Sequence, residues 1–261
     1  MQFTIEVIND KGTVQFERSS EDEVYAVYDK EYAAGDKIRI SCSKKNVFAL
    51  VKLDDSMDTA LVYLTGSFIL PVPFNEQKKS YNPKSFTGSR HYVYMREAGE
   101  SEIKTPHNLA FNPYDCHENK TLFPHTYANV ETRGESVFAS RNAVDGLIAN
   151  TFHGEWPYSS WGINRDPAAE FHLDFGRRVV LYSVTLYLRA DFPHDSWWES
   201  ADISFSDGST ITVSLRKTGS AQVFTFEPKT VTGLVLCHLI KADDDSPFPA
   251  LTQIEAYGIE A

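Results

Sequence analysis

The chain has 261 residues, of which 42% are apolar, 13% aromatic and 23% charged, so it can build one large domain or two of ordinary size. This composition excludes a disordered, collagen-like or coiled-coil chain. The formal net charge of −11 argues against nucleic acid and acidic membranes as partners, because both carry negative charge themselves.

The first twenty residues alternate in polarity and reach Asp10 without an apolar core, so they do not form a signal peptide. No later apolar stretch is long enough to span a bilayer. The three cysteines, Cys42, Cys116 and Cys237, are widely spaced without a CxxC pair, which fits neither a disulfide framework nor a zinc knuckle. We therefore expect a cytoplasmic protein with free thiols.

The first part of the chain alternates with a period of two. Apolar positions recur at Phe3, Ile5 and Val7 and again at Ile38 and Ile40, and the runs end in turn sequences such as KGT and AGDK. The last such strand of this part is expected from His91 to Glu97. Alternation bounded by turn residues is typical of half-buried strands, so we place an N-terminal β-sandwich at residues 1–105.

A polar stretch rich in Pro, Asn and Lys follows, and it predicts a connector at residues 106–122 packed between two domains. Alternation then resumes at Val184, Leu186 and Leu188 and at Ile203 and Phe205. Val137 to Leu147 is the best candidate for a short helical turn. The fold is thus predicted to be all-β, with a second β-sandwich at residues 123–261.

Four motifs of the second half occur in an order typical of one known family. They are Asn142-Ala143-Val144-Asp145-Gly146 followed by Thr151, then Ala169 to Gly176 (AEFHLDFG), then Ser204 to Gly208 (SFSDG), and finally Ile254 to Gly258 (IEAYG). Together they resemble the discoidin or coagulation-factor type C domain, over roughly residues 125 to 259. The resemblance implies a galactose-binding-like jelly roll. The N-terminal half resembles no family that we can name.

Members of this family typically bind sugars, lipid headgroups or protein surfaces through loops at one end of the sandwich, and they are not catalytic themselves. The resemblance therefore implies binding. It also implies a structural calcium, whose matching ligands here are Asn142, Asp145, Thr151 and Glu255, since calcium takes six to eight oxygen ligands. Leu147 and the late position of Thr151 depart from the family pattern. The alternative is that Asp145-Gly146 is only a turn and Glu255 a surface residue.

All four tryptophans lie in two turn-like segments, 152–166 and 189–199, among Gly, Pro, Asp and Asn. A sugar ring stacks on aromatic faces and needs fixed donors and acceptors for its hydroxyls. Arg189 follows an expected strand and should point from the mouth of the sandwich, unless it only forms a salt bridge to a nearby Asp. The candidate ligand-binding residues are Glu155, Trp156, Arg165, Arg189, His194, Asp195, Trp197 and Trp198. Alternatively, some of the tryptophans plug the open end, Trp161 being the best placed for that.

The connector contains His107, Cys116, His117 and His125, whose spacing matches no closed zinc pattern. We expect these histidines to be satisfied by backbone groups. Together with Glu118, the three histidines could instead form the site of a glycan-processing enzyme between the domains, but the sequence contains no GxSxG, P-loop or dinucleotide motif.

The sequence thus predicts a non-catalytic protein that docks a neutral or weakly charged carbohydrate on the C-terminal loops. The first alternative is a protein-interaction or self-association module that uses the same loops, because Trp and Arg are also favoured interface anchors. The second is the interdomain enzyme. Membrane binding is disfavoured because acidic residues accompany the tryptophans.

Overall fold

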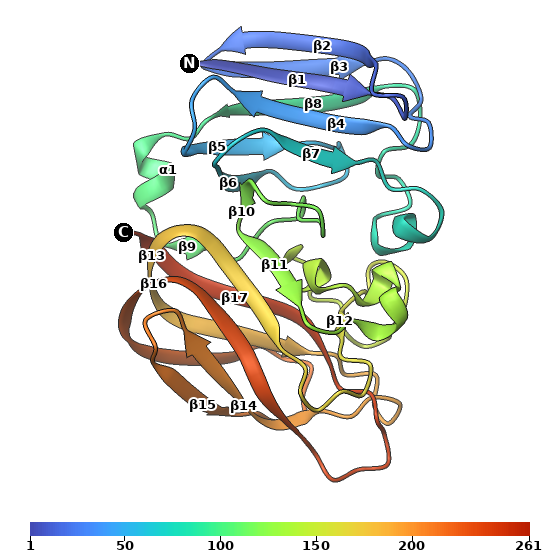
Figure 1. Ribbon diagram of the computed structural model, residues 1–261. Coiled ribbons are helices and arrows are strands. Elements are labelled where there is room, and N and C mark those ends of the chain that lie inside the picture. Colours follow the sequence, from blue (N-terminus) through green and yellow to red (C-terminus); the bar gives the residue numbers. More distant parts are fainter.

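The computed structural model describes residues 1–261 and consists almost entirely of antiparallel strands. Two β-rich bodies lie one above the other, with the short strands of the connector between them (Figure 1). The predicted all-β fold of two sandwiches is confirmed. None of the helices is long and apolar enough to cross a membrane.

The N-terminal sandwich consists of a four-stranded sheet, ordered β2-β1-β4-β7, and a five-stranded sheet, ordered β10-β6-β5-β8-β3. Its strands are β1 (Gln2–Ile8), β2 (Val14–Glu21), β3 (Glu23–Tyr28), β4 (Lys37–Cys42), β5 (Val47–Lys52), β6 (Ala60–Leu64), β7 (Phe68–Pro71), β8 (His91–Glu97) and β10 (Leu122–Phe123). Along β3 and β5 every second side chain is buried, as period-two alternation requires. Those side chains join a core of 25 residues.

The C-terminal sandwich is one rolled sheet, ordered β12-β17-β13-β16-β14-β15, with β9 added to β17 and β11 added to β13. Its strands are β9 (His107–Asn108), β11 (His125–Ala128), β12 (Trp161–Gly162), β13 (Phe171–Leu188), β14 (Trp198–Phe205), β15 (Thr210–Ser214), β16 (Gln222–Lys241) and β17 (Ala250–Glu260). It encloses a separate core of 28 buried residues.

The roll depends on the long strands β13 and β16, whose pairing shifts register between Asp174 and Val179. Such a bulge bends a strand and increases its twist. Gly176 lies in this bulge at φ +66°, where a Cβ would come within 2.3 Å of the Phe123 ring of β10. A glycine is therefore needed where the roll meets the connector.

Helical structure is confined to short segments. They are the α-helix α1 (Glu100–Lys104) and the 3-10 segments η1 (Asn75–Ser80), η2 (Thr132–Gly134), η3 (Ser136–Phe138) and η4 (Ser140–Val144). The short helical turn predicted between Val137 and Leu147 corresponds to η3 and η4. These turns lie against β12 and β17 and carry part of the pocket described next.

Candidate functional site

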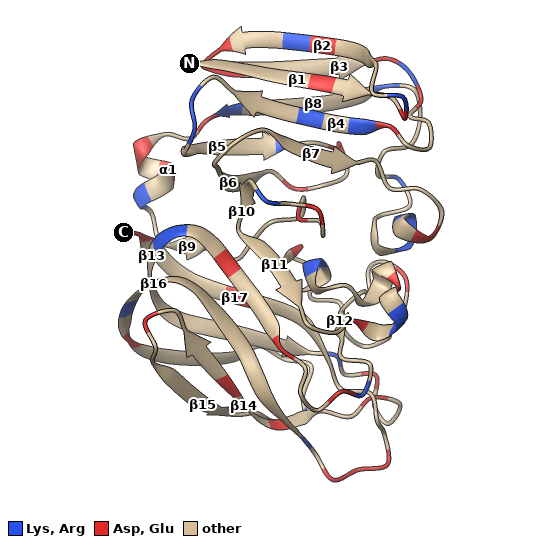
Figure 2. Ribbon diagram, viewed as in Figure 1, with Lys and Arg blue, Asp and Glu red and all other residues tan.

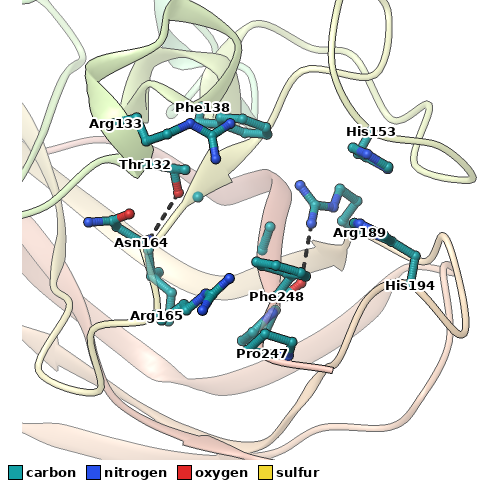
Figure 3. Close-up of a pocket in the computed structure, with 14 residues that line it drawn as sticks. Thr132, Arg133, Phe138, His153, Asn164, Arg165, Arg189, His194, Pro247 and Phe248 are labelled. Carbon is teal, nitrogen blue, oxygen red and sulfur yellow. Dashed lines mark hydrogen bonds between the residues drawn. The ribbon is translucent and has the colours of Figure 1, made fainter. Parts of the chain in front are cut away.

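A pocket of about 400 Å³ opens at the loop end of the C-terminal sandwich. Its walls come from five separate segments, which are residues 132–138, His153, residues 162–165, the pair Arg189 and His194, and residues 247–250. Figure 3 shows the side chains of these segments converging on one space. The volume lies in the range of small-ligand sites.

Arg189 directly follows β13 and is held at the pocket by a buried ion pair. Its Nε donates to both carboxylate oxygens of Asp195, at 2.9 and 3.0 Å, and its Nη2 donates to Oδ1 at 2.6 Å. Nη2 also donates to the Phe248 carbonyl at 3.2 Å. The arginine side chain is 5% exposed and that of Asp195 is 0% exposed. Nη1 makes no hydrogen bond within the chain and stays free for a ligand.

A stack of rings forms one wall of the pocket. The His153 and His194 rings are parallel within 4°, with centroids 4.1 Å apart, and the His194 ring stacks on Phe248 at 5.3 Å. Asp191 accepts a hydrogen bond from His153 Nδ1 at 2.7 Å, and Asp195 accepts one from His194 Nδ1 at 3.1 Å. These hydrogen bonds fix the orientation of both imidazole rings, which line the pocket.

The segment after β12 forms the opposite wall in an unusual backbone conformation. Asn164 and Arg165 both have positive φ, +48° and +63°, which is uncommon for residues other than glycine. The backbone N–H of Asn164 donates to Thr132 Oγ1 at 2.9 Å, and this bond is drawn in Figure 3. A Cβ on Gly162 would lie 2.6 Å from the same Oγ1. The absence of a side chain at Gly162 thus lets the two walls approach.

No family model matches this chain, and no curated protein matches it. Among solved structures, the chain is similar to chitosan-binding module 1 of a chitosanase/glucanase from Paenibacillus sp. IK-5, with 20% identity, a TM-score of 0.40 and coverage of 59% of this chain and 100% of that one. A fucose binding module of Streptococcus pneumoniae is 15% identical, with a TM-score of 0.42 and coverage of 59% and 99%.

The lectin domain of lectinolysin complexed with Lewis b antigen is 16% identical, with a TM-score of 0.44 and coverage of 59% of this chain and 98% of that one. Each of these matches covers almost the whole of the other chain and about three fifths of this one.

The structure brings four of the eight predicted ligand-binding residues together. Arg165, Arg189 and His194 line the pocket, and Asp195 lies beneath Arg189. The salt bridge considered as the alternative for Arg189 does form, but it holds the guanidinium at the pocket instead of removing it.

Two other predicted residues face the N-terminal sandwich. The Trp156 amide donates to the Lys79 carbonyl at 2.8 Å, and Glu155 lies 3.6 Å from Lys79 Nζ. Trp156 lines a separate small cavity of about 70 Å³ between the sandwiches. The segment from Glu155 to Trp156 thus belongs to the contact between domains.

The expectation of open tryptophan faces is wrong for Trp198. Its side chain is 0% exposed, and its ring lies 6.3 Å from that of Trp161, which is also 0% exposed. Both begin strands that close the end of the roll, so their rings fill the core. Trp197 is half-buried against that core. Trp161 and Trp198 thus plug the end of the sandwich, which is the alternative considered for Trp161.

The four residues matched to a calcium site have other contacts. The side-chain Nδ2 of Asn142 donates to the carbonyls of Ser136 and Ser160, and its Oδ1 accepts from the Arg141 guanidinium. Burial raises the pKa of Asp145 to about 7, against the opposing effect of the nearby Arg141 guanidinium.

Thr151 is exposed, and Glu255 shares the outer face of β17 with Tyr257. The Asn142 side chain is bound to protein groups and Arg141 acts on the Asp145 carboxylate, so this set is a poor fit for a shared cation site. Calcium stays a prediction.

His153, Asp191 and His194 also qualify as metal ligands by distance, since one ligand atom of each lies within 4.8 Å of the others. The ring orientation argues against a shared ion. An imidazole binds a metal through a lone pair in its own plane, and these planes are parallel and 4.1 Å apart between centroids. The group is better described as a hydrogen-bonded aromatic stack.

The connector histidines do not converge on one site. The His107 ring faces the Thr105 carbonyl at 2.7 Å, as expected, whereas His117 pairs with Glu131 and His125 with Asp115. Burial raises the pKa of Cys116 to about 12, so this thiol is inert. His117 and Glu118 line a cavity of about 260 Å³ between the sandwiches, but His107 and His125 do not.

Several pocket residues were not predicted, namely Thr132, Phe138, Asn164 and Phe248. Only Phe248 left a signal in the sequence. It stands between Pro247 and Pro249 after three consecutive aspartates, and such a rigid, polar turn that presents one aromatic side chain is typical of a binding loop. The others are distant in sequence and meet only through the fold.

Proposed function

We propose that this chain is a non-catalytic carbohydrate-binding protein whose ligand docks in the pocket at the loop end of the C-terminal sandwich. The observation that carries the proposal is the Arg189–Asp195 ion pair at the base of a pocket walled by stacked rings. A fixed guanidinium beside apolar rings matches a ligand that has both hydroxyls and a C–H face.

The contacts within the pocket support this assignment. Arg189 keeps one uncommitted Nη1 group, and Asn164 presents a side-chain amide without a partner in the chain. These groups can bind hydroxyls, while the half-buried Phe248 ring offers an apolar surface. An open site with few contacts gives weak binding, and we expect a Kd of order micromolar to millimolar.

The arrangement of carboxylates supports binding over glycoside hydrolysis. Hydrolysis uses two carboxyl groups about 5–10 Å apart that face the substrate. No Asp or Glu lines this pocket, and the carboxylates that contact its lining residues, Asp191, Asp195 and Glu135, bind His153, Arg189 and Arg133. The resemblance to the discoidin family, which rests on the four motifs, agrees with a binding role.

The test is a glycan array followed by calorimetric titration of the best ligand. Phe248→Ala and His194→Ala should each weaken binding about tenfold or more, because they remove the ring wall. Neither should lower the free energy of unfolding much, since both side chains are partly exposed. Tyr92→Ala is the matched control, because Tyr92 is 41% exposed on the other sandwich.

Three outcomes would contradict the proposal. The first is an array without any bound glycan, and the second is unchanged binding in both pocket variants. The third is a stable dimer in sedimentation that buries His194 and Phe248, which would favour the self-association alternative.

A further inference from the structure

We infer that the pocket selects an acidic saccharide, one whose sugar carries a carboxylate, and that Arg165 is the specificity-determining residue. This inference rests on the proposed function and names its ligand class. The sequence favours a neutral or weakly charged ligand, whereas this inference requires a carboxylate.

The pocket is basic although the protein is acidic. Its lining contains three arginines and two histidines but no aspartate or glutamate, in a chain with a net charge of −11. Acidic residues occur on both sandwiches, including the loop between β16 and β17 that carries Phe248 (Figure 2). A positively charged pocket in a negatively charged surface raises the local concentration of anionic ligands.

Arg165 is the lining arginine without an acidic partner. Arg133 pairs with Glu135 and Arg189 pairs with Asp195, whereas Arg165 forms no ion pair and no side-chain hydrogen bond. Its guanidinium carbon lies 4.8 Å from the centroid of the Phe248 ring. Figure 3 shows Arg165 and Arg189 on opposite sides of Phe248, both directed into the pocket. The full fork of Arg165 is thus free.

The backbone holds this free charge in place. Arg165 and its neighbour Asn164 both have positive φ, a conformation that persists only where the surroundings impose it. Here the Thr132 hydroxyl accepts a hydrogen bond from the backbone N–H of Asn164. The loop is therefore preorganised, so ordering it on binding costs little.

The chemistry of the free groups favours a carboxylate. A guanidinium fork matches the two oxygens of a carboxylate with two parallel N–H···O bonds. Arg165 can supply that fork while Nη1 of Arg189 binds a neighbouring oxygen of the same sugar. A neutral sugar would leave the Arg165 charge without compensation, so the acid should bind more tightly.

The experiment compares free acids with their methyl esters. An array carries a panel of uronides and sialosides, each printed in both forms, together with neutral and sulfated glycans. The best pair is then titrated into wild-type protein by calorimetry. We expect the free acid to bind about tenfold or more tightly than its ester, with affinity that falls as salt rises.

Three variants then assign the effect to Arg165. Arg165→Gln should weaken binding of the acid about tenfold and of the ester less than twofold. Arg165→Lys keeps the charge but loses the fork, so its affinity for the acid should fall in between. Arg178→Gln is the control for net charge, because Arg178 is exposed and lies outside the pocket. It should change neither affinity by more than twofold.

The failures are distinguishable. Binding of neutral glycans with equal or weaker binding of acids overturns the acidic-ligand inference but leaves the proposed function. Binding of sulfated glycans alone overturns the carboxylate assignment. An equal loss of acid and ester binding in Arg165→Gln overturns the role of Arg165. Absence of any glycan binding removes both proposals.

Discussion

At the scale of single residues, the ion pair of Arg189 and Asp195 determines both the shape and the stability of the site. Arg189→Ala would leave the Asp195 carboxylate buried without its partner, so we expect a loss of about 3–5 kcal/mol in the free energy of unfolding. The double variant Arg189→Ala, Asp195→Ala should be less destabilised than the sum of the two single variants. Chemical denaturation measures both, with Arg165→Ala, which should stay within about 0.5 kcal/mol of wild type, as the exposed control. Additive losses would contradict this account.

The same residues show what the sequence could reveal about the site. Arg189 was predictable because a strand ends at Leu188, and a residue just past a strand points from the end of the sandwich. Trp198 was misjudged because it looks like part of a turn, whereas it is the first residue of β14 and faces the core. One position decides whether a side chain at a strand end points inward or outward, and local composition does not reveal that position.

At the scale of elements, the two-residue strand β12 sets the distance between the walls of the pocket. Gly162→Ala would place a Cβ 2.6 Å from Thr132 Oγ1 and 3.2 Å from Phe138 Cβ, so Thr132 must move away and the Asn164 contact is strained. We expect binding to weaken about tenfold with only about 1–3 kcal/mol of destabilisation. Titration and denaturation measure the two effects. Gly66→Ala in the N-terminal sandwich is the control, because a Cβ there would lie 3.4 Å from the nearest atom, Cγ2 of Thr121. An equal loss of binding in Gly66→Ala, or no loss in Gly162→Ala, would contradict this role of Gly162.

Elements also explain how far the fold was predictable. Long alternating strands such as β3 and β5 were found because each has three buried positions at a period of two. The strands β9, β10 and β12 have two residues each, which is too short for any period to appear. Yet these short strands attach the connector to both sandwiches and form the edge of the pocket, so the details that position the site arise from tertiary contacts.

At the scale of the whole molecule, the connector belongs to both cores. Tyr114 and Leu122 join the core of the N-terminal sandwich, while Leu109 and Ala110 join that of the C-terminal one. Further contacts cross directly, since the Arg141 guanidinium lies 4.4 Å from the Tyr81 ring centroid. A connector that is buried on both sides cannot release one sandwich without exposing core of the other. We therefore expect one cooperative unfolding transition.

The positions of the tryptophans make this cooperativity measurable. All four lie between Trp156 and Trp198, so tryptophan fluorescence reports on the C-terminal sandwich and, through Trp156, on its contact with the N-terminal one. Ile40→Ala creates a cavity in β4, deep in the N-terminal core, and should cost about 2–5 kcal/mol. If the two sandwiches unfold together, this distant change lowers the midpoint of the fluorescence transition by several degrees, whereas Tyr25→Ala, on an exposed face, leaves it unchanged. A fluorescence midpoint that stays fixed while calorimetry shows an earlier second transition would mean that the sandwiches unfold independently.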